Sequence, residues 1–479
     1  MNFRRLALTI LALPLGLFAE EAKPRPNIVI IFTDDQGYAD LGCYGSEKIR
    51  TPRLDRMAAE GIRFTNFHVA SSVCSASRAS LLTGRYSSRH GVRGVFVPGN
   101  SGMSPDEVTL AEVLRPIGYA TACIGKWHLG DAPQFLPTTQ GFDTYFGIPY
   151  SNDMYIGPDQ TFAPDATFRD GWTHERAIEA QAFVKKNAAK RAAIAAKGLR
   201  DLVPLMEGKQ IVEFPADQAS LTRRYFDRAI DFINRATTDN KSFFIYLAPA
   251  MPHVPLFASS EFLGKSTRGL YGDTVEEIDH HVGRLLDHLT TRRLDENTLV
   301  IFSSDNGPWL GKGAAAGSSG PFRDGKFSVY EGGLRVPAII RWPTRIPARQ
   351  TSDALVSTID LFPTLARFTH TPLPDRPLDG KDISAHLLNP SAPFAPQPFF
   401  CMNNGRPVGV IDGDWKYLPH GGAKNPAQDA PPELYYLTKD PGEKDNLAAA
   451  HPDIVARLLA ILKSAHSGKE SKRKSKSKE

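Results

Sequence analysis

The sequence predicts an α/β fold: a three-layer, doubly wound, mostly parallel sheet followed by a smaller C-terminal α+β subdomain. The first observation is the continuous apolar, β-branched run at residues 27–32, which is typical of a strand buried on both faces of a parallel sheet. The second is that later strand-like runs at 120–124, 243–247 and 299–302 are separated by helical segments. Such alternation favours a parallel sheet with helices on both faces.

The helices of this core are predicted from local signals. Thr51 and Pro52 supply an N-cap and a first-turn proline for a helix that Gly61 ends. Longer helices are predicted over residues 221–236 and 275–289. Placed between the buried runs, these helices complete the outer layers of the fold.

Composition changes mark the limits of the large domain. An Ala- and Lys-rich stretch at 175–198 predicts an exposed helix in an insertion. Proline clusters at 343–347 and 372–377 mark the end of the large domain, and a third at 390–398 reads as a linker. The large domain is therefore predicted to span residues 24–385.

The C-terminal part is predicted to be a small α+β unit over residues 395–467. Hairpin strands are expected at 409–417 and 433–437, and a closing helix at 452–464. Residues 468–479 are rich in lysine and lack aromatic side chains, so they are predicted to be a disordered basic tail. The alternative is that this tail holds an acidic surface by unspecific attraction.

The N-terminal end resembles an export signal. Arg4 and Arg5 precede an apolar run over residues 6–18, which ends at Ala19. This pattern is typical of a cleaved signal peptide at 1–19 and is too short for a membrane span. We therefore expect an exported protein, periplasmic or secreted, without stable membrane insertion.

Charge and cysteine content exclude two other classes. The formal net charge of +5 comes from the two ends, and no nucleic-acid-binding motif accompanies it, so no nucleic-acid partner is expected. The four cysteines, Cys43, Cys74, Cys123 and Cys401, are too scattered for a disulfide framework and contain no CxxC pair. If Cys74 is reserved for chemistry, at most one bridge forms among the others, and its pairing stays open.

Cys74 is the first candidate functional residue. It stands where a run of small hydroxyl residues enters a short helix, and Arg78 follows one turn later. Free backbone N–H groups and the positive end of the helix dipole would face the cysteine. These neighbours predict a lowered pKa for Cys74 and a role as a nucleophile or its precursor. The alternative is a buried, small apolar side chain.

Two acidic pairs follow two of the predicted strands. Asp34 and Asp35 come after the first strand, and Asp305 and Asn306 come after the run at 299–302. Because carboxyl ends of parallel strands converge on one crevice, these groups are expected to meet there. Gathered carboxylates favour a hard cation, Ca²⁺ or Mg²⁺. The alternative is that each aspartate only caps a loop.

Cationic side chains also follow the predicted strands. Lys126 and His128 lie in a Gly-Lys-Trp-His-Leu-Gly block, His253 follows the run at 243–247, and Lys326 stands in a Gly-rich loop. Lysines beside a tetrahedral anion neutralise charge that grows in the transition state, and histidines move protons near neutral pH. A lone Lys or His on a loop is otherwise simply solvated.

The stretch Cys-Ser-Ala-Ser-Arg at 74–78, followed by Leu-Leu-Thr-Gly-Arg at 81–85, resembles the signature of the type I, arylsulfatase A-like sulfatases of the alkaline phosphatase superfamily. The resemblance spans roughly residues 25–370 and thins at 155–220 and in the C-terminal part. The chain differs at Ala76, where the commonest family form has proline.

The resemblance implies the cofactors and the role of each residue. In that family a maturation enzyme oxidises the cysteine to formylglycine, whose hydrate is the nucleophile. The implied ligands of one Ca²⁺ are Asp34, Asp35, Asp305, Asn306 and an oxygen of modified Cys74. The implied sulfate-binding and proton-transfer residues are Arg78, which holds the modified side chain, Lys126, Lys326, Ser151, His128 and His253.

The reaction that this resemblance implies has two stages. One hydroxyl of the hydrate, with Asp305 accepting its proton, attacks sulfur, and the alcohol leaves protonated from the side of His253 and Lys326. His128 then removes the proton of the second hydroxyl, and sulfate is expelled.

We therefore expect an exported sulfuric ester hydrolase acting on a sulfated carbohydrate or aryl sulfate. The alternatives are a phosphomonoester or phosphonate hydrolase of the same superfamily, and a catalytically silent protein that binds sulfated glycans. Selectivity is expected in the loops at 154–168, 257–272 and 309–323.

Overall fold

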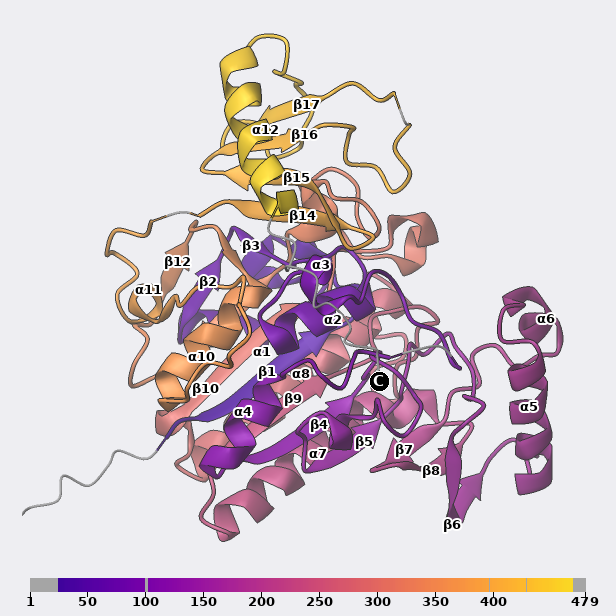
Figure 1. Ribbon diagram of the computed structural model, residues 1–479. Helices are drawn as coiled ribbons and strands as arrows, with labels where there is room; N and C mark the ends of the chain where they lie inside the picture. Colours follow the sequence, from indigo (N-terminus) through magenta and orange to yellow (C-terminus); the bar gives the residue numbers. More distant parts are fainter. Residues whose placement is uncertain (1–24, 100–101, 396, 428, 468–479) are drawn as a thin grey trace, which may run out of the picture.

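The computed structural model describes residues 25–99, 102–395, 397–427 and 429–467. Figure 1 shows one large sheet with helices on both faces and a small separate sheet, covered by the last helix, at the C-terminal end. The predicted fold class is confirmed. The predicted signal peptide and basic tail, residues 1–19 and 468–479, lie outside the described residues. No helix in the described ranges is long and apolar enough to cross a membrane.

The large sheet has eleven strands in the order β12-β2-β11-β10-β1-β9-β4-β5-β7-β8-β6. The five central strands, from β10 to β5, run parallel to one another. The strands of this sheet are β1 Asn27–Thr33, β2 Ile62–Phe64, β4 Ala120–Gly125, β5 Thr144–Gly147, β6 Thr161–Phe168, β7 Leu205–Glu207, β8 Gln210–Phe214, β9 Phe243–Ala248, β10 Thr298–Ser304, β11 Ala338–Arg341 and β12 Gln350–Ser352.

Smaller sheets and the helices complete the fold. Strands β3 Phe67–His68 and β13 Val356–Ser357 pair with each other, and the C-terminal sheet contains β14 Phe399–Asn403, β15 Arg406–Asp412, β16 Trp415–Leu418 and β17 Glu433–Tyr436. The helices are α1 Pro52–Ala59, α2 Cys74–Thr83, α3 Ser87–His90, α4 Leu110–Leu114, α5 His174–Lys186, α6 Arg191–Ala196, α7 Gln218–Thr238, α8 Leu270–Thr291, α9 Glu331–Leu334, α10 Leu361–Thr369, α11 Ser384–Leu388 and α12 Pro452–Ser467.

The three layers follow from the side-chain alternation of the central strands. In β1, Ile28 and Ile30 belong to the core that contains residues of α2, α4 and α10. Val29 and Ile31 belong to the opposite core, which contains residues of α1, α7 and α8. Because successive side chains of a strand point to opposite faces, a continuous apolar run is needed to fill both cores.

Strand register brings the loops of the site to one edge. Thr33 at the end of β1 pairs with Ser304 at the end of β10, and Gly125 at the end of β4 pairs with Ala248 at the end of β9. Gly125 has φ +103°, and a Cβ there would lie 2.1 Å from the carbonyl oxygen of Ala248. Only glycine therefore allows this approach, which sets the starting point of the loop that carries Lys126.

Two of the elements expected from the sequence have other limits in the structure. The single helix expected at 175–198 is two helices, α5 and α6, because Asn187 caps the first one by donating from Nδ2 to the Phe183 carbonyl. The single strand expected at 409–417 is the hairpin β15–β16, because Gly413, with φ +60°, turns the chain. The domain limits 24–385 and 395–467 stay a prediction.

A buried charge network joins the C-terminal sheet to the large domain. Lys416 on β16 forms ion pairs of 2.9 Å with Glu331 on α9 and with Glu443, and all three side chains are fully buried. His68 on β3 lies 3.0 Å from the second oxygen of Glu331. Since α9 begins five residues after Lys326, the network supports the segment that brings this lysine to the site.

Replacing Lys416 tests this support. Lys416→Met leaves two buried carboxylates without their shared cation, which we expect to lower the free energy of unfolding by about 3 kcal/mol in urea denaturation. Lys439→Met, an exposed change in the same subdomain, is the control and stays within about 0.5 kcal/mol. Equal stability of the two variants would contradict a supporting role.

Candidate active site

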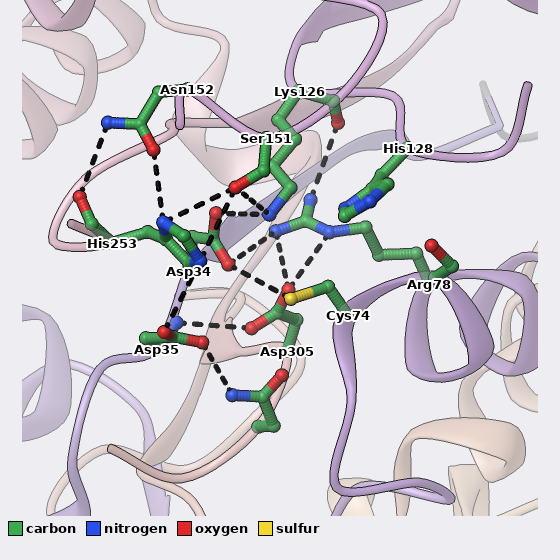
Figure 2. A network of polar contacts seen from close by, with 12 residues as sticks. Asp34, Asp35, Cys74, Arg78, Lys126, His128, Ser151, Asn152, His253 and Asp305 are labelled. Atoms are coloured by element: carbon green, nitrogen blue, oxygen red, sulfur yellow. Dashed lines mark hydrogen bonds and ion pairs between the residues drawn. The ribbon is translucent and has the colours of Figure 1, made fainter. Parts of the chain in front are cut away.

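The predicted functional residues meet in one buried pocket at the carboxyl edge of the large sheet. Figure 2 shows side chains from the ends of β1, β4, β9 and β10 converging on the first residue of α2. Nearly all of these side chains are buried, so their charges interact with little screening by water.

Cys74 is the first residue of α2 and is only 1% exposed. Its Sγ lies 3.5 Å from Oδ1 of Asp34 and 3.1 Å from Nζ of Lys326. The prediction of a lowered pKa for this thiol is wrong: burial raises the pKa of Cys74, and the charge of Asp305 raises it further against the opposing lysines. An unmodified Cys74 is therefore a protonated thiol near neutral pH, which is a poor nucleophile.

The guanidinium group of Arg78 is bound to the carboxylate of Asp305. Its Nε and Nη2 donate to Oδ2 of Asp305 at 3.0 and 2.7 Å, and its Nη1 donates to the hydroxyl of Tyr246 at 3.1 Å. Arg78 has no exposed surface and neither has Asp305. Burial raises the pKa of Asp305, and Asp34 adds to this effect against the attraction of Arg78.

Two lysines balance the acidic pair that follows β1. Lys126 forms an ion pair with Asp34 and donates to Oγ of Ser151 at 3.3 Å. Lys326 forms an ion pair of 2.5 Å with Asp35. Burial alone would raise the pKa of Asp34, but Lys126 and other cations lower it overall. Burial alone would lower the pKa of Lys326, but Asp35 and its neighbours hold it well above its usual range.

His253 bridges the acidic pair and the β5 side of the pocket. Its Nδ1 lies 3.0 Å from Oδ1 of Asn152 and 2.6 Å from the Val254 carbonyl. Both partners are acceptors, so Nδ1 carries a proton and Nε2, 3.6 Å from Oδ2 of Asp35, faces the carboxylate. Burial lowers the pKa of His253, while Asp35 opposes this.

His128 lies near Arg78 in Figure 2, and its hydrogen bond goes to the carbonyl of Phe96, on another loop. Nε2 lies 3.1 Å from the carbonyl oxygen of Phe96, which makes Nε2 the donor, and the buried Nδ1 has no hydrogen-bond partner. Burial, with the charge of Lys126, lowers the pKa of His128 well below its usual range. His128 is therefore a neutral imidazole with an unshared acceptor nitrogen.

Three side chains in and beside the pocket depend on left-handed backbone conformations. Asp35, His128 and Phe327, the residue after Lys326, have φ values of 60°, 60° and 78°. Such conformations cost of order 1 kcal/mol for residues other than glycine and cluster at functional sites. Asp35 lies two residues after the end of β1 and His128 three residues after the end of β4, so these two conformations turn the chain where each loop begins.

The acidic residues have the chemistry of a cation site. Ligand atoms of Asp34, Asp35, Cys74 and His253 lie within 4.8 Å of one another. Oδ2 of Asp35 and Oδ1 of the adjacent Asn306 are buried and have no hydrogen-bond partner. Oxygen donors without protein partners fit a hard divalent ion such as Ca²⁺. Asp305, a predicted ligand, lies at the border of this group, with its oxygens bound by Arg78 and the Asp35 amide.

Sequence reasoning missed three members of the pocket. Asn152 orients His253 and also donates from Nδ2 to the Pro255 carbonyl at 2.7 Å. Tyr246 lies on β9 and contacts Arg78, and the carbonyl of Phe96 fixes the tautomer of His128. The neighbouring Ser151 gave a signal for Asn152, whereas a backbone carbonyl and a tyrosine within an apolar strand gave none.

Comparisons with known proteins all indicate the same family. The sulfatase family model matches residues 26–371. Human arylsulfatase A is 40% identical over 95% of this chain and 90% of its own length. The N-acetylgalactosamine-6-sulfatase of Canis lupus familiaris is 35% identical over 93% of this chain and 87% of its own length.

Solved structures extend these similarities. PsFucS1 sulfatase from Pseudoalteromonas sp. superposes with a TM-score of 0.77 at 27% identity, over 92% of this chain and 90% of that one. Ps i-CgsB, solved in complex with k-i-k-neocarrahexaose, gives 0.75 at 28% identity, over 92% of each chain. The phosphonate monoester hydrolase of Agrobacterium radiobacter, at 19% identity and a TM-score of 0.61, over 92% of this chain and 96% of that one, shares the fold.

The doubly wound sheet with its pocket at the strand ends is that of the alkaline phosphatase superfamily of hydrolases. Within it, the chain belongs to the sulfatase family and is a sulfuric ester hydrolase similar to arylsulfatases A and G. The expected family is thus confirmed, and the expected alternative of a silent glycan-binding protein is not favoured.

Proposed function

We propose that this sulfatase removes sulfate from a sulfated carbohydrate, or from an aryl sulfate, through a formylglycine made from Cys74 and with one bound Ca²⁺. The observation that carries the proposal is the placement of Cys74, a buried thiol with a raised pKa between Lys326 and Asp34. Such a thiol has little use as a nucleophile, and its position suits an oxidised side chain that is held by the same cations.

Formylglycine and Ca²⁺ would have separate roles in the reaction. The hydrate of formylglycine supplies an oxygen nucleophile in place of sulfur, and a maturation enzyme is its required partner. Asp34, Asp35, Asp305 and Asn306 would hold the Ca²⁺, which supplies Lewis-acid stabilisation of negative charge when bound. Arg78 fixes Asp305 from the far side, so this carboxylate is positioned to accept a proton from the nucleophile.

The lysines bind the sulfate. Lys126 and Lys326 enter the pocket from opposite loops, and their ammonium groups lie beside Asp34 and Asp35 respectively. Ser151, 3.3 Å from Lys126, adds a hydroxyl donor. With these donors in place before substrate arrives, the charge that grows on the sulfate oxygens is stabilised without rearrangement of the protein.

The histidines divide the proton transfers. His253 lies beside Ser151 with Nε2 toward Asp35, where it would contact the leaving oxygen and donate to it from Nε2 once that nitrogen has taken up a proton. His128 is neutral and keeps Nδ1 free of partners, so it is suited to remove a proton when the covalent intermediate breaks down.

The substrate class rests on the relatives and the export signal. N-acetylgalactosamine-6-sulfatase and a structure in complex with neocarrahexaose are among the similar proteins. Residues 1–19 have the pattern of a signal peptide. We therefore infer a periplasmic or secreted enzyme that meets sulfated polysaccharide outside the cytoplasm.

Turnover of aryl sulfate and aryl phosphate by one preparation tests the reaction. We expect aryl sulfate to be hydrolysed far faster, and Cys74→Ala to abolish it while Cys43→Ala, a change at a half-buried cysteine in the 3-10 helix Gly42–Tyr44, keeps it. Mass spectrometry should find the Cys74 peptide alone shifted below the mass of its thiol form. Faster hydrolysis of aryl phosphate would contradict the proposal and support the phosphatase alternative.

Lys326→Ala tests the sulfate-binding lysines. Loss of a buried donor to the transition state is expected to lower kcat by about 10²- to 10³-fold, while circular dichroism shows an intact fold. Lys241→Ala, an exposed change just before β9, should leave kcat unaltered. A near-normal rate in Lys326→Ala would remove this lysine from the catalytic set.

Chelation tests the metal with a readout independent of activity. A bound cation stabilises the folded state by about 3 kcal/mol at a hundredfold excess over its Kd, so a chelator should lower Tm and added Ca²⁺ should restore it. Asp35→Asn should shrink this shift, whereas Asp239→Asn, which is exposed, should preserve it. A Tm that changes neither with the chelator nor with added Ca²⁺ would exclude the proposed Ca²⁺ site.

A further inference from the structure

Two lysines that the proposed reaction does not use lie on an aromatic pair at the rim of the pocket. Nζ of Lys312 lies 4.2 Å from the ring centroid of Trp309, and Nζ of Lys424 lies 3.9 Å from that of Phe327. The two rings meet edge to face at 5.3 Å. Lys312 belongs to the 3-10 helix Leu310–Ala315 after β10, and Lys424 to the β16–β17 connection of the C-terminal subdomain.

The aromatic pair adjoins the leaving-group side of the pocket. The Trp309 ring lies 5.9 Å from the ring of His253, and Nζ of Lys326 lies 5.2 Å from the Trp309 centroid and 5.6 Å from that of Phe327. Each rim lysine is thus one aromatic ring away from the sulfate-binding Lys326. A group held by the rim lysines would belong to the part of the substrate next to the cleaved ester.

The rim lysines differ from the lysines inside the pocket in their charge balance. Lys126 and Lys326 are each paired with a buried aspartate. Across the described residues, neither Lys312 nor Lys424 lies within ion-pair distance of a carboxylate, and Lys424 is exposed. A ring face orients an ammonium group but leaves its charge and its N–H donors available to an anion.

We propose that Lys312 and Lys424 form a subsite for a second anionic group of the substrate, a sulfate ester or a carboxylate on the sugar next to the cleaved ester. This inference rests on the proposed function, and it names the substrate as a multiply anionic carbohydrate. Trp309 and Phe327 hold the two ammonium groups in place, and the loop at 309–323 thereby sets selectivity.

Matched disaccharides test the subsite. Three substrates share the cleaved ester and carry a second sulfate, a carboxylate or no second charge. For wild type we expect kcat/KM about tenfold higher with a second anion at low salt, mainly through KM, and a smaller preference at high salt. In Lys312→Gln/Lys424→Gln this preference should fall to near unity, and the two anionic substrates show which group the subsite prefers.

The control is Lys209→Gln/Lys241→Gln, which removes the same charge from exposed positions outside the rim and should keep the preference. Equal kcat/KM for charged and uncharged disaccharides in wild type, or an equal loss on all three in the rim variant, would overturn the subsite.

Aryl sulfate turnover on the same wild-type preparation separates this test from that of the proposed function. If aryl sulfate is not hydrolysed, the sulfatase mechanism fails, and calorimetric binding of the disulfated and monosulfated disaccharides to the protein still decides the subsite. Tighter binding of the disulfated compound that disappears in the rim variant supports it, and equal binding overturns it.

Discussion

Charge compensation among buried side chains is the constraint on which the rest of this structure depends. Asp34, Asp35 and Asp305 are buried, and such charges persist only when each has a well-placed partner. Lys126 and Lys326 supply those partners from two different loops, and Arg78 supplies the third from helix α2. Because three carboxylates are matched by three cations, removing any one of these six side chains leaves a buried charge without its partner.

The balance requires precise delivery of groups that are far apart in the sequence. The parallel register of β1, β9, β4 and β10 aligns their ends, and that alignment fixes where each loop starts. Lys326 has no strand directly before it. Its segment is held instead by the backbone bond from Val329 to Gly422, 2.8 Å long, and by the buried pair of Glu331 with Lys416. Tertiary contacts thus position Lys326, whereas the ends of the strands position Asp34, Asp35, Lys126 and Asp305.

The central part of the fold could be predicted because its signals are local. The apolar runs at 27–32, 120–124, 243–247 and 299–302 predicted buried parallel strands. The polar residues that follow these runs predicted the site. The outer strands β6, β7 and β8 were not predicted: β6 is largely exposed and lacks clean alternation, and its place depends on pairing with β8.

The electrostatics of the site were the least predictable part. The helix start and Arg78 correctly placed Cys74, but they suggested a lowered pKa because the sequence does not reveal burial or the use of Arg78 by Asp305. Likewise, the tautomer of His128 depends on a carbonyl of a distant loop. Such effects arise from desolvation and long-range contacts, which a linear pattern does not encode.

One short stretch of the C-terminal subdomain, from β16 to the connection that follows it, contacts the large domain at two places near the site. Lys416 pairs with Glu331 at the start of α9, which follows the loop of Lys326, and Lys424, in the connection after the same strand, lies over the ring of Phe327. A recombination event that exchanged this subdomain between related enzymes would therefore replace both contacts at the same time. Diversification of such enzymes by module exchange is coupled in this way to the integrity of their catalytic centre.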